Sequence, residues 1–201
     1  MLLRLLLLAS TPSDAVAVEV DSGALRRIAW REPAPVLAPY DLIEAHALTS
    51  VDVPFPNDMV TAVDPVVVGR LRGRRVAKLL KPLVYPGDQP LLGAPTPSVT
   101  YWAMRSDAPS VALVAPAAGP VVERDGDLHL RCRFRWRRLD HDLPLDDPSL
   151  DERLSHPTAT RLAGGTLARA LGWKPERLVV SLRPPVEGRC HKVVAGLLPR
   201  P

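Results

Sequence analysis

Cysteine, lysine and aromatic residues are scarce in this chain of 201 residues, which contains 2 Cys, 4 Lys and 9 aromatic residues. Two cysteines cannot form the disulfide framework of a small secreted protein, which favours a reducing compartment. Long apolar segments are missing too, because no run approaches the ~20 residues of a membrane-spanning helix. The sequence therefore predicts a cytoplasmic protein with no membrane contact.

The first ten residues, MLLRLLLLAS, are a candidate targeting segment. After Arg4, however, the apolar stretch covers only residues 5–9, which is below the ~7–15 residues of the apolar region of a signal peptide. Ala15 and Ala17 resemble a cleavage site, so secretion stays an alternative. A buried first strand is the prediction that we carry forward.

Proline and short apolar runs are abundant. The chain contains 23 Pro and is 46% apolar and 24% charged, a composition that excludes global disorder. Apolar runs separated by Pro, Gly and Asp recur from end to end, as in proteins built from many short strands. Helices are expected only at residues 70–83, 148–154 and 158–171, and a Pro- and Gly-rich stretch at residues 86–97 indicates a domain boundary. The predicted fold is mainly β with short connector helices.

Residues 127–139 show an almost perfect period of two. Alternate positions point to opposite faces of a strand, which separates an apolar set from a cationic set. The apolar set is Leu128, Leu130, Cys132, Phe134 and Trp136, and the cationic set is His129, Arg131, Arg133, Arg135 and Arg137. A row of arginines repels itself unless solvent, carboxylates or a polyanion neutralise it. Contact with nucleic acid and pairing with nearby acids such as Glu123 and Asp125 are both open interpretations.

A second basic run covers residues 70–81 and contains no acid. Leu71, Val76, Leu79 and Leu80 can form the buried stripe of a short helix. The cations of this run are then exposed. They form either a solvated helix face or a second surface that contacts phosphates. The candidate members of that contact are Arg70, Arg72, Arg74, Arg75 and Lys78.

Catalytic and metal-binding patterns are weak. Asp140, His141 and Asp142 could suggest a metal site, but Asp146 and Asp147 before Pro148 are better explained as a turn that caps a helix. No nucleophile motif is present, and residues 164–166 (GGT) lack the lysine of a phosphate-binding loop. We predict no catalytic residue, no metal site and no cofactor, although an enzyme acting on nucleotides stays an alternative.

Several segments resemble the bacterial dual OB domain-containing proteins, which are described as pairs of oligonucleotide/oligosaccharide-binding barrels. The similar segments are residues 133–148 (RFRWRRLDHDLPLDDP), 181–196 (SLRPPVEGRCHKVVAG), 29–31 (AWR) and 68–71 (VGRL). His191 stands where the family usually has Tyr, and residues 10–13 (STPS) depart from its Asn-Ser-Lys step. The resemblance implies two small OB-like β-barrels, a divergent one at residues 1–97 and a second at residues 98–201, and a role in nucleic-acid recognition.

Together these observations predict a non-enzymatic protein that binds nucleic acid, such as single-stranded DNA or RNA, through Arg131, Arg133, Arg135 and Arg137. Residues Arg70, Arg72, Arg74, Arg75 and Lys78 are expected to assist. The alternative is an interaction or scaffold subunit that docks a partner protein, such as the product of a neighbouring gene, and has no nucleic-acid role.

Overall fold

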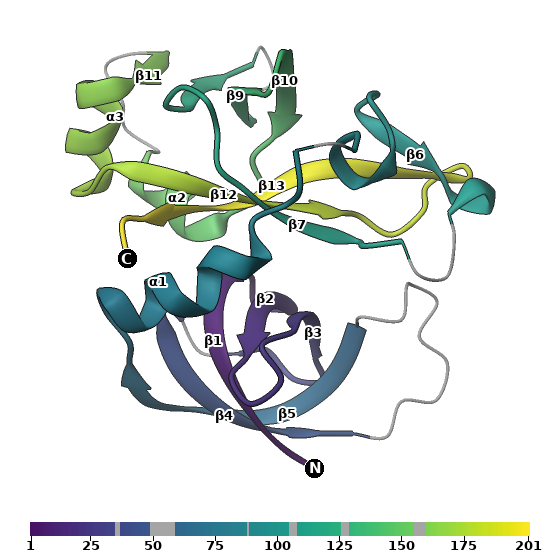
Figure 1. Cartoon of the computed structure of the whole chain (residues 1–201), viewed down its shortest axis with the longest axis vertical. Helices are drawn as coiled ribbons and strands as arrows, with labels where there is room; N and C mark the ends of the chain where they lie inside the picture. Colours follow the sequence, from purple (N-terminus) through teal and green to yellow (C-terminus); the bar gives the residue numbers. More distant parts are fainter. Residues whose placement is uncertain (35–36, 49–58, 88, 105–107, 126–128, 155–159) are drawn as a thin grey trace.

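The computed structural model describes residues 1–34, 37–48, 59–87, 89–104, 108–125, 129–154 and 160–201. In these ranges the chain forms thirteen strands and only short helices, which confirms the mainly β class. Figure 1 shows the first five strands in the lower half of the molecule and the other strands in the upper half.

The N-terminal half is a closed barrel with the strand order β1-β2-β3-β5-β4. All neighbouring pairs are antiparallel except β3 and β5, which are parallel. The polar, proline-punctuated sequence of residues 49–64 predicts a loop. This prediction is wrong for residues 59–64, which belong to β5, while residues 49–58 lie outside the described ranges. The strands are β1 (Leu2–Ser10), β2 (Asp14–Glu19), β3 (Leu25–Trp30), β4 (Asp41–Ala47) and β5 (Met59–Arg70).

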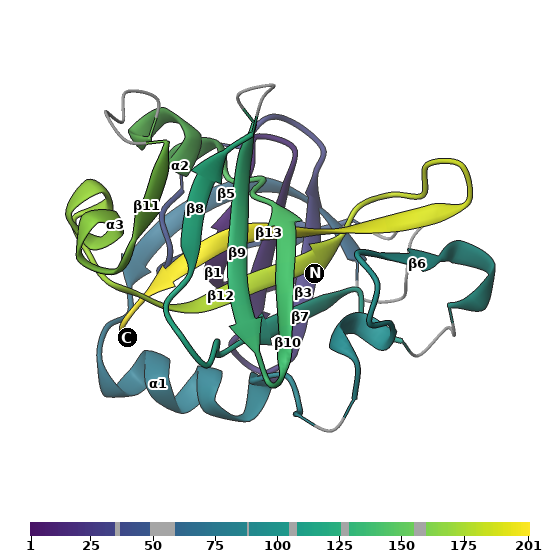
Figure 2. The ribbon, with the colours of Figure 1, turned by 90° about the horizontal axis from the view of Figure 1, so that it is seen from above.

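The C-terminal half contains two four-stranded sheets, ordered β10-β9-β8-β11 and β6-β13-β12-β7. A single parallel bridge between Leu145 and Val194 connects them, and their facing apolar side chains share one core. Figure 2 shows the strands of the two sheets crossing each other. The strands are β6 (Ser98–Thr100), β7 (Val111–Val114), β8 (Val121–Arg124), β9 (Leu130–Trp136), β10 (Leu139–Pro144), β11 (Arg161–Ala163), β12 (Pro175–Leu182) and β13 (Arg189–Pro199).

The three expected helices are present as α1 (Arg74–Leu80), α2 (Pro148–Arg153) and α3 (Gly164–Leu171). The third begins later than predicted because residues 161–163 pair with β8 as strand β11. Short 3-10 turns follow α1 and flank β6: η1 (Lys81–Leu83), η2 (Leu91–Gly93) and η3 (Tyr101–Ala103). Among the described residues, no helix is long and apolar enough to cross a membrane.

The two halves are joined by a shared core. Leu6 and Leu8 of the barrel and Leu80 of α1 belong to the same buried cluster as Leu113 and Leu198 of the second half. The segment that follows η1 belongs to the second half as well, because Leu91 and Leu92 enter its core and Tyr85 donates its amide to Leu113 O. Tyr85, Leu91 and Leu92 therefore pack with the second half although they precede residue 98, and the boundary at residue 97 stays a prediction.

Candidate nucleic-acid interface

Strand β9 has the two-faced character that its sequence predicts. Leu130, Cys132, Phe134 and Trp136 are buried, whereas Arg131, Arg133 and Arg135 lie on the outer face of the sheet. The alternation follows from the geometry of a strand, whose neighbouring side chains point to opposite faces.

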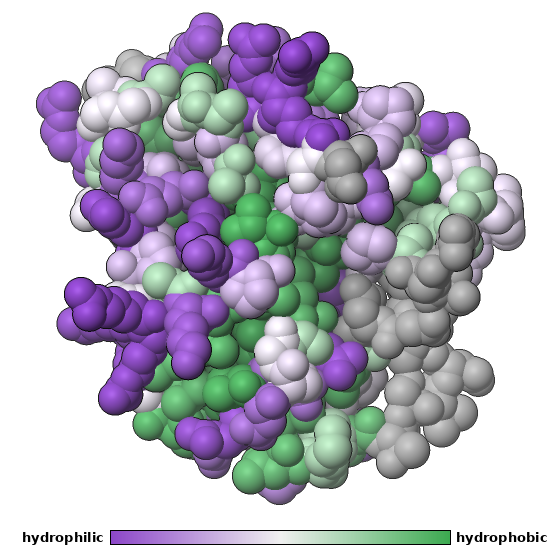
Figure 3. Space-filling model, viewed as in Figure 1, coloured by the Kyte–Doolittle hydropathy of each residue, from purple (hydrophilic) through white to green (hydrophobic). Residues whose placement is uncertain are grey.

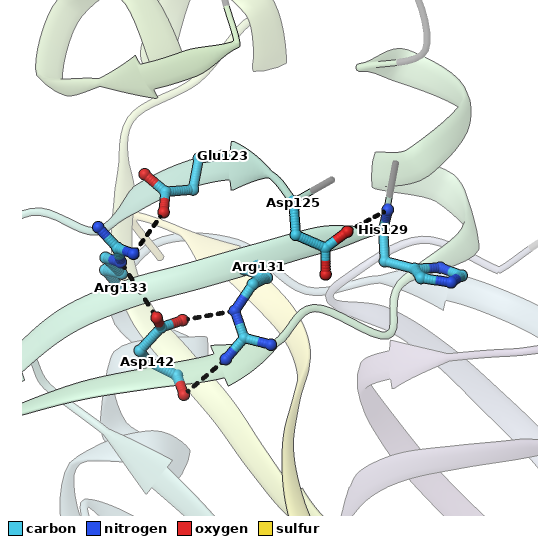
Figure 4. Close-up of polar contacts among 6 residues, drawn as sticks. All are labelled: Glu123, Asp125, His129, Arg131, Arg133 and Asp142. Carbon is cyan, nitrogen blue, oxygen red and sulfur yellow. Dashed lines mark hydrogen bonds and ion pairs between the residues drawn. The ribbon is translucent and has the colours of Figure 1, made fainter. Parts of the chain in front are cut away.

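The arginine row is not open, because acidic residues of the neighbouring strands pair with it. Asp142 of β10 accepts hydrogen bonds from Arg131 Nε at 2.8 Å and from Arg133 Nε at 3.1 Å. Glu123 of β8 lies 2.8 Å from Arg133 Nη2. Figure 4 shows Arg133 between these two carboxylates. Of the two interpretations that the sequence left open, pairing with nearby acids applies to Arg131 and Arg133, since β10 and β8 place carboxylates within reach.

The other two arginines of the row differ from this pattern and from each other. Arg135 lies 3.9 Å from Asp140, whose side chain is 83% exposed, so the pair is loose. Arg137 is not in the strand at all: it occupies the two-residue turn between β9 and β10 at a positive φ of 60°. Its guanidinium carbon lies 5.3 Å from the centre of the Trp136 ring. We use the name β9 ladder for Arg131, Arg133 and Arg135 with Glu123, Asp140 and Asp142.

Helix α1 carries cations of a different kind. Val76 and Leu80 are fully buried and fix the helix against the core. Arg70, just before the helix, pairs with Asp41 at 2.8 Å and is thereby neutralised. The remaining cations are exposed, and none has an ion pair within the described ranges. We call them the α1 cation cluster: Arg72, Arg74, Arg75, Lys78 and Lys81.

This cluster accounts for the whole net charge of the protein. The chain has a formal net charge of +4, and the five members of the cluster exceed it by one. The rest of the chain is therefore close to neutral, with one net negative charge. Figure 3 shows strongly hydrophilic side chains projecting from the side of the molecule where α1 lies.

The ladder and the cluster lie on different parts of the surface. Figures 1 and 2 show the β9 ladder strand in the upper sheet and α1 at the junction of the two halves. They are connected through the segment after η1, where Tyr85 lies 5.8 Å from the ring of Trp136 and Gln89 O lies 3.5 Å from Arg137 Nη1. The predicted residues thus form two separate surfaces.

The acidic segment after β10 lines a cleft of about 520 Å³ with Arg131 and Arg183. Asp147 accepts the amides of Ser149 and Leu150 and so caps α2, as expected from the sequence. Asp146 is paired with Arg183 at 2.7 Å. In the described part of the chain, no three His, Cys, Asp or Glu side chains come together in a way that could hold a metal ion.

Two residues with unusual environments escaped the sequence analysis. Lys192 is 1% exposed, and its ammonium donates to the carbonyls of Ala94 and Thr96, the latter at 2.7 Å. Burial lowers the pKa of Lys192 to about 8. Trp102 is the opposite case, since 78% of its surface is exposed. In the sequence, Cys190, His191 and Lys192 interrupt an otherwise apolar run, and this interruption could have indicated Lys192. Nothing in the sequence distinguishes Trp102 from the buried tryptophans.

His141 and the cysteines are structural. His141 stacks on Phe134 with ring centres 5.1 Å apart, and burial, with a smaller contribution from Lys192, lowers its pKa. Cys132 and Cys190 are both free and buried, and burial raises the pKa of each thiol. Protonated, buried thiols are poor nucleophiles and poor metal ligands.

Comparison with known proteins yields no match: no family model matches this sequence, and neither a curated protein nor a solved structure matches the chain.

Proposed function

We propose that this protein binds nucleic acid without catalysis, and that the α1 cation cluster makes the main contact with the phosphates. The observation that carries the proposal is the concentration of five exposed cations, free of ion pairs in the described ranges, on one short segment. The β9 ladder, predicted as the main contact, has at most an accessory role in this proposal, since carboxylates hold Arg131 and Arg133.

The electrostatics favour a polyanion as the ligand of this surface. Like charges at positions three and four apart on a helix destabilise it, and Arg74 and Arg75 both have this relation to Lys78. A phosphate backbone relieves this repulsion and releases its own counterions, so binding gains free energy mainly at low salt. Arg72, Arg74 and Arg75 add planar guanidinium groups that can donate two parallel hydrogen bonds to one phosphate.

The architecture of the N-terminal half supports the same proposal. Its five strands close into one small barrel, the size and strand number of an OB-fold, which commonly binds oligonucleotides. We propose that the barrel is OB-like and that α1, which follows its last strand, provides the basic margin of a nucleic-acid site.

The experiment is a salt-dependent titration of a fluorescently labelled oligonucleotide, followed by anisotropy. The test variant combines Arg74→Glu, Arg75→Glu and Lys78→Glu. The control variant combines Arg161→Glu, Arg169→Glu and Lys174→Glu, which makes the same change in net charge at exposed cations near α3. We expect micromolar or tighter binding by the wild type at low salt, loss of most of this affinity in the test variant, and a smaller loss in the control.

Equal losses in the two variants would show that only net charge matters and would remove α1 as the site. Flat titrations of the wild-type protein at low salt would remove the nucleic-acid proposal altogether.

A second candidate function is the docking of a partner protein, and the observation that favours it lies on β5. Val66, Val67 and Val68 are 58%, 48% and 46% exposed. Register shifts in the pairing of β4 with β5 leave this stretch irregular, and contiguous exposed apolar residues commonly mark interaction sites. A pull-down with the product of a neighbouring gene should then be unaffected by the α1 charge reversals and weakened by Val67→Asp.

A further inference from the structure

The most exposed aromatic side chain of the described chain lies at the tip formed by η3 and the β12–β13 hairpin. Trp102 is 78% exposed, whereas Trp30 and Trp136 are buried and Trp173 is half-buried. An indole left in water loses the free energy that its burial would provide. Covering this indole with a ligand would therefore be favourable.

The indole of Trp102 is held in a defined position. Tyr101 donates its backbone amide to Gly188 O at 2.9 Å, which ties η3 to the hairpin turn. The ring of Tyr101 contacts that of Trp102 edge-on, with centres 5.3 Å apart.

Gly188 is required for this arrangement. Its φ is +73°, and a Cβ atom at this position would come within 3.2 Å of Trp102 Nε1. The turn thus leaves room for the indole at its edge. A ring fixed in this way needs little further ordering when a ligand stacks on it, which favours binding.

A cation adjoins the turn that holds the ring. Arg189 follows Gly188 and is exposed; its Nε donates to Ser98 Oγ at 2.9 Å, and no carboxylate pairs with it among the described residues. His191 lies two residues further along β13 on the same exposed face. Glu187 is the acid of the turn. A flat apolar ring beside an uncompensated guanidinium matches the two parts of a nucleotide, the base and the phosphate.

From these contacts we infer that Trp102 is a stacking platform for an unpaired nucleobase and that Arg189 holds the adjoining phosphate. The inference rests on the proposed function and adds a preference for single strands. In both ribbon views, β6 and η3 lie at the opposite end of the molecule from the N-terminus of α1 (Figures 1 and 2). The site therefore contacts a different part of the bound strand than the α1 cation cluster does.

The test compares a single-stranded oligonucleotide of about 20 nucleotides, longer than the usual site of one OB-sized module, with the duplex of the same sequence. We expect Trp102→Ala to weaken binding of the single strand roughly five- to a hundredfold, the range found when a stacking ring is removed, and to leave duplex binding unchanged. Trp102→Phe should retain most of the affinity because a ring remains. Val186→Ala, which trims another exposed apolar residue of the same tip, should have no effect.

Two further measurements address the stack and the phosphate separately. Binding of the single strand should quench the tryptophan fluorescence of the wild type, and Trp102→Phe should abolish that quenching while the other tryptophans remain. Arg189→Ala should weaken the single-stranded complex, and Glu187→Gln should strengthen it.

The outcomes separate this inference from the proposed function. If the α1 reversals abolish binding while Trp102→Ala binds the single strand like the wild type, the stacking site is refuted and the function stands. Equal weakening of single strand and duplex by Trp102→Ala also refutes stacking on an unpaired base. If wild-type protein binds neither oligonucleotide, both proposals fall.

Discussion

At the scale of a single residue, Lys192 is the position where burial and charge conflict. Its ammonium lies in the interior of the C-terminal half among carbonyl groups, and no carboxylate of the described residues pairs with it. Two hydrogen bonds to carbonyls recover only part of the hydration that the charge loses on burial, so its pKa falls from 10.5 to about 8.

This depressed pKa predicts an unusual stability profile in alkali. Between pH 8 and the pKa of 10.5, the unfolded chain holds a proton on Lys192 that the folded chain has released, so stability rises with pH. For Lys192 alone the rise amounts to about 1 kcal/mol between pH 8 and pH 9. Above pH 9 the buried thiols of Cys132 and Cys190, whose pKa values are raised in the folded state, ionise first in the unfolded chain, as does Tyr40 near pH 10, and these groups lower the stability again.

Urea unfolding of the wild type and of Lys192→Met between pH 8 and pH 9 should show that the stability of the wild type rises relative to that of the variant. The same slope in both proteins would mean that the lysine titrates normally. Lys174→Met, at an exposed lysine, is the matched control and should retain the slope.

At the scale of an element, the β9 ladder shows how a sheet neutralises its own charges. The register places Asp142 opposite Arg133 and Glu123 opposite Arg131. The long arginine side chains can also contact the carboxylate that lies diagonally across from them on the neighbouring strand. Because Arg133 and Asp142 are 49% and 39% exposed, solvent and salt screen these pairs, and each contributes little to folding.

We therefore expect Asp142→Ala to lower the free energy of unfolding by only about 1 kcal/mol or less. The same change removes the carboxylate partner of Arg131 and leaves Arg133 with Glu123 alone, so affinity for an oligonucleotide should increase several-fold at low salt and not at high salt. Denaturation and anisotropy measure the two effects. Asp140→Ala, which removes the loose partner of Arg135, is the control. It should change both the free energy of unfolding and the affinity less than Asp142→Ala does. Unchanged affinity at low salt would show that phosphates do not reach the ladder.

At the scale of the whole molecule, the barrel and the two sheets depend on each other. Their shared core contains Leu6, Leu80 and Leu198, all of which are fully buried. Tyr40 of the barrel also donates its hydroxyl to Pro199 O at 2.6 Å. Neither half can therefore keep all of its buried surface covered if the other unfolds.

This predicts one cooperative unfolding transition. Leu80→Ala, which opens a cavity in the shared core, should cost about 2–5 kcal/mol. It should shift the circular dichroism and the tryptophan fluorescence by the same amount, since Trp30 reports on the barrel and Trp136 on the second half. Two separate transitions, or a shift seen by one probe only, would contradict the shared core. Leu79→Ala, at a partly buried position, provides the comparison.

Local patterns predicted much of the architecture. Most strands contain or overlap one of the short apolar runs of the sequence, and the three helices lie within or overlap the expected segments. Strands β8, β10 and β11 were missed because they are short or contain charged residues and proline, so their stability comes from pairing with a neighbour rather than from an apolar pattern.

The candidate site was only half predictable, and the reason is the range of the interactions. The period of two in β9 determined from sequence alone which side chains are core and which are outside, because alternation is a property of one strand. The five cations of the α1 segment were equally visible. Only the tertiary structure decided that carboxylates pair with arginines of β9 and, within the described ranges, not with the α1 cation cluster. Asp142 reaches the arginines because of the register in which β10 pairs with β9. Charge along a chain is local information, whereas the compensation of that charge depends on which strands become neighbours.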